Sequence, residues 1–384
     1  MALIDEGLWR GAAALPRLGE LATGRDNNLN LIRALAATGV LASHAWPIAL
    51  GGAAAEPLET LTGFSLGGLC VMLFFAASGF LIAGSWERRP DPLRFALARA
   101  LRLFPALAAS LVLVALVMGP LVTGRGLADY AADPAVRSFL VRNLALVSPQ
   151  YTLPGVFESN PYPMVEGSIW TLVHEALCYA GVMVAGVLGL MAPRRLPAAL
   201  CTLAALWLGL ALWGGLPGRL SRLHELSATF AMGVALWAWR DRVALSGWGA
   251  LALFGLALAA SQADPEGPGG TLSRLAWGAA LAYGVLWAAY VPAGALRGFN
   301  DFGDYSYGIY VYAFPVQGLM VWWLGPQTPL ANIALSLPLT LALAVASWHL
   351  VERPALGLLT RRARRAPTGR LARDGSTRAR PAAA

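Results

Sequence analysis

Residues 31–50 read LIRALAATGVLASHAWPIAL, a run of twenty positions dominated by apolar side chains. A helix of about 20 mostly apolar residues can cross the hydrocarbon core of a bilayer, so this run predicts a transmembrane span. It carries two ionisable groups, Arg33 and His44, which are costly inside a membrane and usually face the bundle interior or a cavity. Eleven residues make nearly three helical turns, so both side chains lie on one face, roughly 16 Å apart along the axis.

The remainder of the chain repeats this apolar pattern. Of its 384 residues, 57% are apolar and only 13% are charged, whereas about a quarter of residues are charged in soluble domains. These figures also exclude a disordered chain, and they favour an all-α polytopic membrane protein with about ten spans. The nine further candidate spans are 66–84, 103–121, 168–190, 198–214, 225–239, 243–261, 274–291, 305–324 and 330–350.

The basic residues predict how the chain crosses the membrane. The net charge of +8 is carried by arginine alone, because the chain contains no lysine. With a cytoplasmic N-terminus, 22 of the 29 basic residues fall in inner segments and one, Arg33, falls within a span. Short cytoplasmic loops are enriched in arginine, so both termini are predicted to be cytoplasmic and nucleic-acid binding is not expected. The six arginines in outer segments are Arg125, Arg137, Arg142, Arg219, Arg222 and Arg274.

Three regions are predicted. Residues 1–26 form a cytoplasmic N-terminal segment without the apolar region of a cleaved signal peptide. Residues 27–356 form the membrane domain, with one long outer loop at about 124–167 that is a candidate lid or acceptor-binding loop. Residues 357–384 are predicted to be an Arg-rich, disordered cytoplasmic tail attracted to anionic lipid. The cysteines are expected to form neither a disulfide framework nor a metal site: Cys70, Cys178 and Cys201.

The fourth span supplies a carboxylate that can reach His44. Ser168, Glu175 and Tyr179 are spaced to share one helix face. Counted from the outer helix ends, Glu175 lies about 10 Å deep and His44 about 9 Å deep, so the two are placed to meet. A carboxylate beside an imidazole raises its basicity, as a general base requires. The alternative is a polar pair that only joins two helices.

Two further features lie between and within the early spans. Arg99 and Arg102 are three residues apart, which lets two arginines on a helix clamp one phosphate. The alternative for this pair is simple anchoring at the cytoplasmic face. Ser78-Gly79-Phe80 interrupts the second span with small residues, which permits a close approach of another helix.

Taken together, residues 27–356 resemble acyltransferase family 3, the bacterial membrane O-acyltransferases. No single motif carries the resemblance; six of them occur in the expected order. These are Arg33-x10-His44; Phe74-Phe75-Ala76-Ala77-Ser78-Gly79-Phe80; Arg99-x-x-Arg102 with Leu103-Phe104-Pro105; Ser168-Ile169-Trp170-Thr171-Leu172 with Glu175 and Tyr179; Ser306-Tyr307-Gly308-Ile309-Tyr310; and Val351-Glu352-Arg353-Pro354.

The resemblance implies transfer of an acyl group, commonly acetyl, from cytoplasmic acyl-CoA to a hydroxyl of a carbohydrate acceptor. Acyl-CoA would be a co-substrate rather than a bound cofactor, and the enzyme would lie in the bacterial inner membrane. His44 would be catalytic with Arg33 in support, and Arg99 and Arg102 would contact the donor phosphates. From the matching depths given above, Glu175 or another acceptor would orient His44. The other motif residues expected to bind substrate or support the site are Ser78, Ser168, Trp170, Tyr179, Tyr307 and Tyr310.

Chemically, these residues favour general-base acyl transfer through His44, with an acyl-histidine intermediate as the alternative. The oxyanion contact is left open among Tyr179, Trp170 and Ser168. Many family members carry a histidine after the Ser-Tyr-x-x-Tyr element, where this chain has Ala313. Some members are fused to a periplasmic hydrolase-like domain, which is not expected in this sequence. This chain is therefore expected to act alone or to pass its acyl group to a separate periplasmic transferase.

Two other functions fit a polytopic chain. A transporter or flippase of lipid-linked sugar also has intramembrane ionisable residues, but such proteins often show internal repeats. Here the ionisable residues cluster in the first and fourth spans, and no repeat is evident. A sensory or scaffolding protein would leave the matching depths of His44 and Glu175 unexplained. The expected partners are therefore acyl-CoA, a carbohydrate acceptor and membrane lipid.

Overall fold

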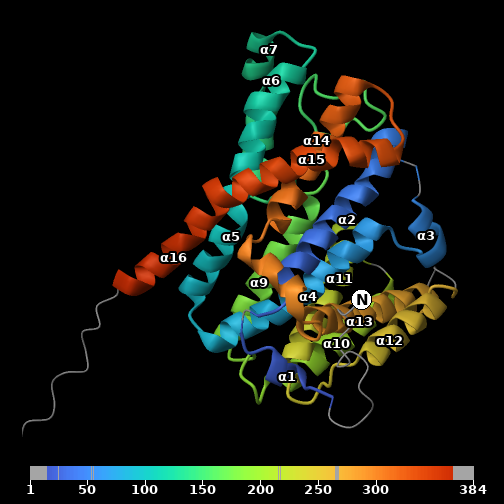
Figure 1. The fold of residues 1–384 in the computed structure, drawn as a ribbon, viewed down its shortest axis with the longest axis vertical. Coiled ribbons are helices and arrows are strands. Elements are labelled where there is room, and N and C mark those ends of the chain that lie inside the picture. Colours follow the sequence, from blue (N-terminus) through green and yellow to red (C-terminus); the bar gives the residue numbers. More distant parts are fainter. Residues whose placement is uncertain are drawn as a thin grey trace, which may run out of the picture.

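The computed structural model describes residues 15–24, 26–52, 54, 56–214, 216, 218–263 and 268–365. Within these ranges every regular element is a helix, as an all-α fold requires (Figure 1). Most of the predicted N-terminal segment, with Arg10 and Arg25, and the end of the predicted tail, from residue 366, lie outside the described residues.

A helix lies at each of the ten predicted spans. The helices are α2 (Leu29–Leu50), α4 (Leu66–Arg88), α5 (Pro92–Val112) continued by η2 (Leu113–Met118) and α6 (Gly119–Val122), α9 (Trp170–Val187), α10 (Leu196–Trp213), α11 (Gly218–Ala238), α12 (Gly247–Ala260), α13 (Pro268–Tyr290), α14 (Ser306–Leu324) and α15 (Pro329–Ser347). The shorter elements are α1 (Leu18–Leu21), α3 (Pro57–Thr62), α7 (Leu127–Ala132), α8 (Pro134–Leu144), η3 (Gly294–Asp301), η4 (Trp348–Glu352) and α16 (Arg353–Arg365).

Length and composition support a membrane protein. Among the described residues, five helices are long and apolar enough to cross a bilayer, or six if the pair bent by 91° between α13 and η3 is one span. The α12 helix has 14 residues and is therefore about 21 Å long, short of a hydrocarbon core of about 30 Å. Ten spans with both termini in the cytoplasm therefore stay a prediction.

The α4 helix lies at the centre of the bundle and packs against α2, α9, α11 and α13 (Figure 1). Its contact with α11 depends on small residues. A Cβ atom at Gly79 would lie 2.0 Å from the Phe230 carbonyl oxygen, and one at Gly233 would lie 2.0 Å from the Ala76 carbonyl oxygen. The close approach predicted from Ser78-Gly79-Phe80 is thus confirmed.

The α14 helix is buried along most of its length and is tied to its neighbours by polar bonds. The Gln317 amide donates to the Leu41 carbonyl of α2 at 2.9 Å and to the Asn332 side chain of α15 at 3.0 Å. Such bonds avoid the cost of an unpaired polar group in an apolar interior. They fix α14 against α2, which carries Arg33 and His44.

The long loop predicted at about 124–167 contains α7 and α8 and then runs irregularly to α9. It is fastened to the bundle, because the Asn160 amide donates to the Gly318 carbonyl of α14 at 2.9 Å. At the other end of the chain, α16 continues to Arg365, so residues 357–365 of the predicted tail are helical rather than disordered.

Candidate active site

Three adjoining cavities contain most of the predicted site residues. We name them the His44 cavity (about 240 Å³), the Glu175 cavity (about 40 Å³) and the Arg88 cavity (about 690 Å³). The first two share the lining residues Val71, Thr171 and Tyr310, and the last two share Arg33. The cavities therefore form a series, with the narrowest one in the middle.

His44 lies on α2 and lines the first cavity beside Ser43. Its ring meets Phe314 of α14 edge-on, with centroids 5.2 Å apart. The Nδ1 atom is buried and has no hydrogen-bond partner among the described residues. Packing against Phe314, rather than a carboxylate, is therefore what holds the imidazole.

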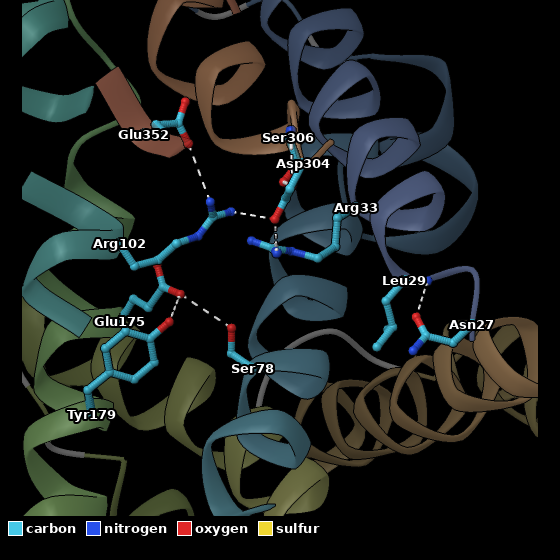
Figure 2. Close-up of polar contacts among 10 residues, drawn as sticks. All are labelled: Asn27, Leu29, Arg33, Ser78, Arg102, Glu175, Tyr179, Asp304, Ser306 and Glu352. Atoms are coloured by element: carbon cyan, nitrogen blue, oxygen red, sulfur yellow. Dashed lines mark hydrogen bonds and ion pairs between the residues drawn. The ribbon is translucent and has the colours of Figure 1, made fainter. Parts of the chain in front are cut away.

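The predicted pairing of His44 with Glu175 is not formed. Instead, Glu175 Oε1 accepts hydrogen bonds from the Ser78 hydroxyl of α4, at 3.3 Å, and from the Tyr179 hydroxyl one turn further along α9 (Figure 2). Matching depths gave the position of each group along its own helix, but the rotation of α9 turns Glu175 toward α4. Glu175 lines the middle cavity, whereas His44 lines the first.

A mostly buried ion-pair network lies beside the middle cavity and the Arg88 cavity. Asp304 accepts from Arg33 at 2.5 Å and from Arg102 at 2.6 Å, and Arg102 also pairs with Glu352 at 3.3 Å (Figure 2). These four residues come from α2, α5, η4 and the turn before α14. Arg33 lines two of the cavities, and its partner Asp304 was missed by the sequence analysis.

Asp304 also binds the first residue of α14. Its Oδ1 accepts from the Ser306 hydroxyl at 2.5 Å and from the Ser306 backbone N–H at 3.3 Å. Burial raises the pKa of an aspartate, but here Arg102, Arg33 and the Ser306 hydrogen bonds lower the pKa of Asp304 to about 2. The carboxylate is therefore charged throughout the physiological pH range. An acidic residue two positions before Ser306 was the sequence signal that could have found it.

Arg99 and Arg102, the predicted phosphate clamp, have different surroundings. Arg102 is only 14% exposed and is taken up by Asp304 and Glu352. The Arg99 guanidinium lies over the rings of Phe95 and Tyr179 at about 6 Å, and its buried Nε has no partner among the described residues. Both arginines point into the bundle because the carboxylates and aromatic rings that attract them lie there.

The boundary between the His44 and Glu175 cavities carries two hydroxyl groups. Tyr310 of α14 donates to the Ser168 carbonyl at 3.0 Å, and the Thr171 hydroxyl of α9 contacts the Tyr310 hydroxyl. Both side chains line both cavities. Tyr307, one of the predicted site residues, lines the Glu175 cavity and donates to the Leu103 carbonyl at 2.8 Å. Thr171 lies within the quoted motif but was not assigned a role.

Ser168 is engaged in the loop rather than in a cavity. Glu166, only 1% exposed, accepts from the Ser168 backbone N–H at 3.1 Å and from its hydroxyl at 2.5 Å. Burial raises the pKa of Glu166 more than the Ser168 hydrogen bonds lower it, and the resulting pKa is about 7. With the Tyr179 hydroxyl taken by Glu175, two of the three predicted oxyanion donors are already occupied. The third, Trp170, lines the His44 cavity.

The Arg88 cavity is the largest and combines cationic with aromatic side chains. Arg33 and Arg88 line it together with Trp237, Tyr290 and Trp348. The Arg88 guanidinium lies 5.8 Å from the centre of the Trp237 ring. Planar guanidinium groups pair well with phosphate, and aromatic rings offer faces to a planar base.

Comparisons with known proteins show the family of the chain. Residues 26–349 match the family described as an acyltransferase domain. The chain is 30% identical to nodulation protein 10 of Rhizobium leguminosarum bv. viciae, over 89% of this chain and 96% of the relative. It is 27% identical to an O-acetyl transferase of Shigella phage Sf6, over 86% of this chain and 96% of the relative. No solved structure matches the chain. The chain therefore belongs to acyltransferase family 3 and is an acyltransferase of membrane character.

Proposed function

We propose that this chain transfers an acyl group, in the first instance acetyl, from acyl-CoA to a hydroxyl of a carbohydrate, with His44 as the general base. The observation that carries this proposal is the series of three adjoining cavities, in which a cationic aromatic cavity and the cavity lined by His44 each share lining residues with a small cavity between them. The phage relative, an O-acetyl transferase, supports oxygen as the acceptor atom.

The donor fits the Arg88 cavity. Its volume of about 690 Å³ lies within the range of roughly 300–1,000 Å³ that is typical of ligand and cofactor pockets. The exposed Arg88 can pair with the donor phosphates, while Trp348 can stack on the adenine. We place the phosphates here rather than at Arg99 and Arg102, because Arg102 is paired with Asp304 and Glu352 and neither residue is among those that line the three cavities.

The Glu175 cavity lies where the arm of the donor would pass. At about 40 Å³ it is too small for a nucleotide, and it must widen to admit the pantetheine arm. Arg33 lies at one end of this passage, and Thr171 and Tyr310 lie at the other. A donor held in the Arg88 cavity would thus present its thioester at the boundary of the His44 cavity.

At that boundary the proposed reaction proceeds in two steps. His44 takes the proton of the acceptor hydroxyl while its oxygen forms a bond to the thioester carbonyl carbon. This bond leaves a negative charge on the carbonyl oxygen, which is the oxyanion of the tetrahedral intermediate. The intermediate collapses as the carbon–sulfur bond breaks, and the coenzyme A sulfur leaves with the proton from the imidazolium. No described group of the chain forms a hydrogen bond with the buried His44 Nδ1 atom, so none competes with a ligand for it.

We further infer that the enzyme works in the inner membrane of a bacterium, with the Arg88 cavity open to the cytoplasm. Arg88 lies in a segment that the arginine distribution assigns to that side. The carbohydrate would then approach the His44 cavity from the opposite face. A separate periplasmic transferase could take the acyl group onward without changing the role of His44.

The test is acetyl transfer by the full chain in inverted membrane vesicles and in cells. Radiolabelled acetyl-CoA is supplied to the vesicles, and the transfer rate is measured. In cells, acetylated glycan is measured by mass spectrometry and compared with cells that lack the gene. His44→Ala is expected to lower the rate about 100- to 10,000-fold. His349→Ala, an exposed histidine outside the three cavities, is the matched control and should retain the wild-type rate.

Wild-type transfer by folded His44→Ala would refute the general-base role. If deletion of the gene altered glycan export without removing any acyl group, the flippase alternative would be favoured instead.

A further inference from the structure

The far rim of the His44 cavity carries charged and aromatic groups that acyl transfer itself does not use. Trp170 of α9, Trp207 of α10 and Arg222 of α11 line this rim. Glu225 of α11 and Arg274 of α13 line it as well. The sequence analysis placed Arg222 and Arg274 in outer segments and used them only to predict how the chain crosses the membrane. Their position in one cavity with His44 is a tertiary feature.

The charges at this rim do not balance. Arg274 Nε lies 3.8 Å from Glu225 Oε1, so these two groups compensate each other. Arg222 has no carboxylate within 4.0 Å in the described part of the chain, and its guanidinium carbon lies 5.2 Å from the centre of the Trp170 ring. One positive charge therefore faces the cavity without a counter-ion among the described residues.

The aromatic groups around Arg222 are held in place. Trp170 packs edge-on against His174, with ring centroids 5.5 Å apart. Trp207 stacks on His224 at 4.2 Å with an interplanar angle of 7°, and the Trp207 Nε1 donates to the His224 carbonyl at 2.6 Å. A cation held over a fixed ring is oriented before a ligand arrives, which reduces the ordering cost of binding.

We propose that Arg222 and Trp170 form an anion subsite for the acceptor, so that the sugar acylated at His44 carries an oxyanion, either its own carboxylate or a phosphate attached to it. This inference rests on the proposed function. The guanidinium fork binds carboxylate and phosphate oxygens in pairs, and the Trp170 ring supports an adjoining sugar ring. The His44 cavity, at about 240 Å³, accommodates one sugar unit together with its charged group.

The subsite predicts discrimination between charged and neutral acceptors. A neutral sugar leaves the Arg222 guanidinium without a partner, whereas an anionic sugar gains a charge-assisted pair. Hydrogen bonds to charged groups are strong enough to change affinity about ten- to a hundred-fold. The effect should appear in the dissociation constant or the acceptor KM, while the KM for acetyl-CoA stays unchanged.

The experiment measures binding to the full chain in nanodiscs of neutral phosphatidylcholine, so that anionic lipid does not occupy the site. The probes are methyl β-D-glucuronide, methyl β-D-glucoside and undecaprenyl phosphate, followed by ligand-observed NMR. The wild-type chain should bind an anionic probe at least about ten-fold more tightly than the glucoside. Arg222→Gln should abolish this preference and Arg222→Lys should retain part of it. Arg137→Gln, an exposed arginine on α8 outside the cavity, should leave it intact.

Two outcomes support the proposal, and each identifies where the anionic group that binds Arg222 comes from. A preference for the glucuronide that depends on Arg222 assigns the anion to the sugar, and a preference for undecaprenyl phosphate assigns it to a lipid carrier. Equal binding of charged and neutral probes by the wild-type chain, or a preference that survives in folded Arg222→Gln, overturns the proposal. Thermal unfolding of each variant establishes that it is folded.

The binding measurement also separates this inference from the proposed function, because it requires no turnover. Arg222-dependent anion binding that persists in His44→Ala supports the subsite independently of acyl transfer. If folded His44→Ala transferred acetyl at the wild-type rate, the general-base role would fall and the subsite would be judged by its binding data alone.

Discussion

Asp304 holds two arginine side chains from different helices in a mostly buried position. Removing one member of a buried ion pair leaves an uncompensated charge, which is more destabilising than losing a surface pair. Asp304 balances Arg33 at the edge of two cavities, and it shares Arg102 with Glu352. The network therefore fixes the geometry of the passage that the donor is proposed to enter.

We expect Asp304→Asn to lower the free energy of unfolding by about 3–5 kcal/mol, because Arg33 loses its carboxylate and Arg102 keeps only Glu352. The lowered pKa of Asp304 gives a stabilisation that is complete above its ordinary pKa of 3.8 and is lost only as the pH falls toward about 2. Between pH 5 and 8 the loss should therefore not vary with pH on account of this group. Denaturant unfolding in detergent measures it.

The control for this variant is Asp26→Asn. Asp26 pairs with Arg297 but is 76% exposed, so its loss should cost no more than about 1 kcal/mol. An equal effect of the two substitutions would contradict a special role for the buried network.

At the scale of elements, the contact of α4 with α11 sets the width of the site, because α4 contributes to all three cavities. Gly79 and Gly233 bring the two backbones together where a Cβ atom would strike a carbonyl oxygen. Backbone atoms cannot yield as a flexible side chain does. Any added methyl group must therefore move one helix relative to the other.

Gly79→Ala is expected to destabilise the protein by about 1–3 kcal/mol and to lower acyl transfer, because separating α4 from α11 distorts the passage. Thermal unfolding and the acetyl-transfer rate measure the two effects. Gly255→Ala on α12 is the matched control, since a Cβ atom there meets nothing within 4 Å. Alanine is the better helix former, so the control should be neutral or slightly stabilising, by up to about 1 kcal/mol. The packing argument fails if Gly79→Ala behaves in the same way.

At the scale of the whole molecule, the series of cavities has a direction. Arg33 and Arg88 line one end, and Arg222 and Arg274 line the other. The arginine distribution assigns the first end to the cytoplasm. Acyl-CoA is a cytoplasmic metabolite, so the orientation decides which cavity can receive the donor.

Cysteine labelling in cells tests this orientation. In a background with Cys70, Cys178 and Cys201 replaced by alanine, we expect Asp129→Cys in α7 to react with an impermeant maleimide in intact cells. Arg89→Cys, at the end of α4, should react only after the membrane is opened. Both positions are exposed. The reverse labelling pattern would place the Arg88 cavity outside the cell and would contradict its assignment to the donor.

The sequence by itself determined the helices, their approximate ends and the family. A sufficiently long apolar run predicts a helix, because a backbone inside a bilayer must form its hydrogen bonds within the segment. The bond between Glu175 and Tyr179 was also predictable, since both groups lie one turn apart on a single helix. The small residues around Gly79 correctly indicated close packing, although not which helix would approach.

The tertiary structure decided how groups on different helices meet. Arg33 and Asp304 are 271 positions apart, and Arg102 and Glu352 are 250 apart, so no local spacing connects them. The predicted pair of His44 and Glu175 was wrong because depth fixes only the position along each axis. Whether two side chains meet depends on the rotation and placement of both helices, which the packing of the whole bundle decides.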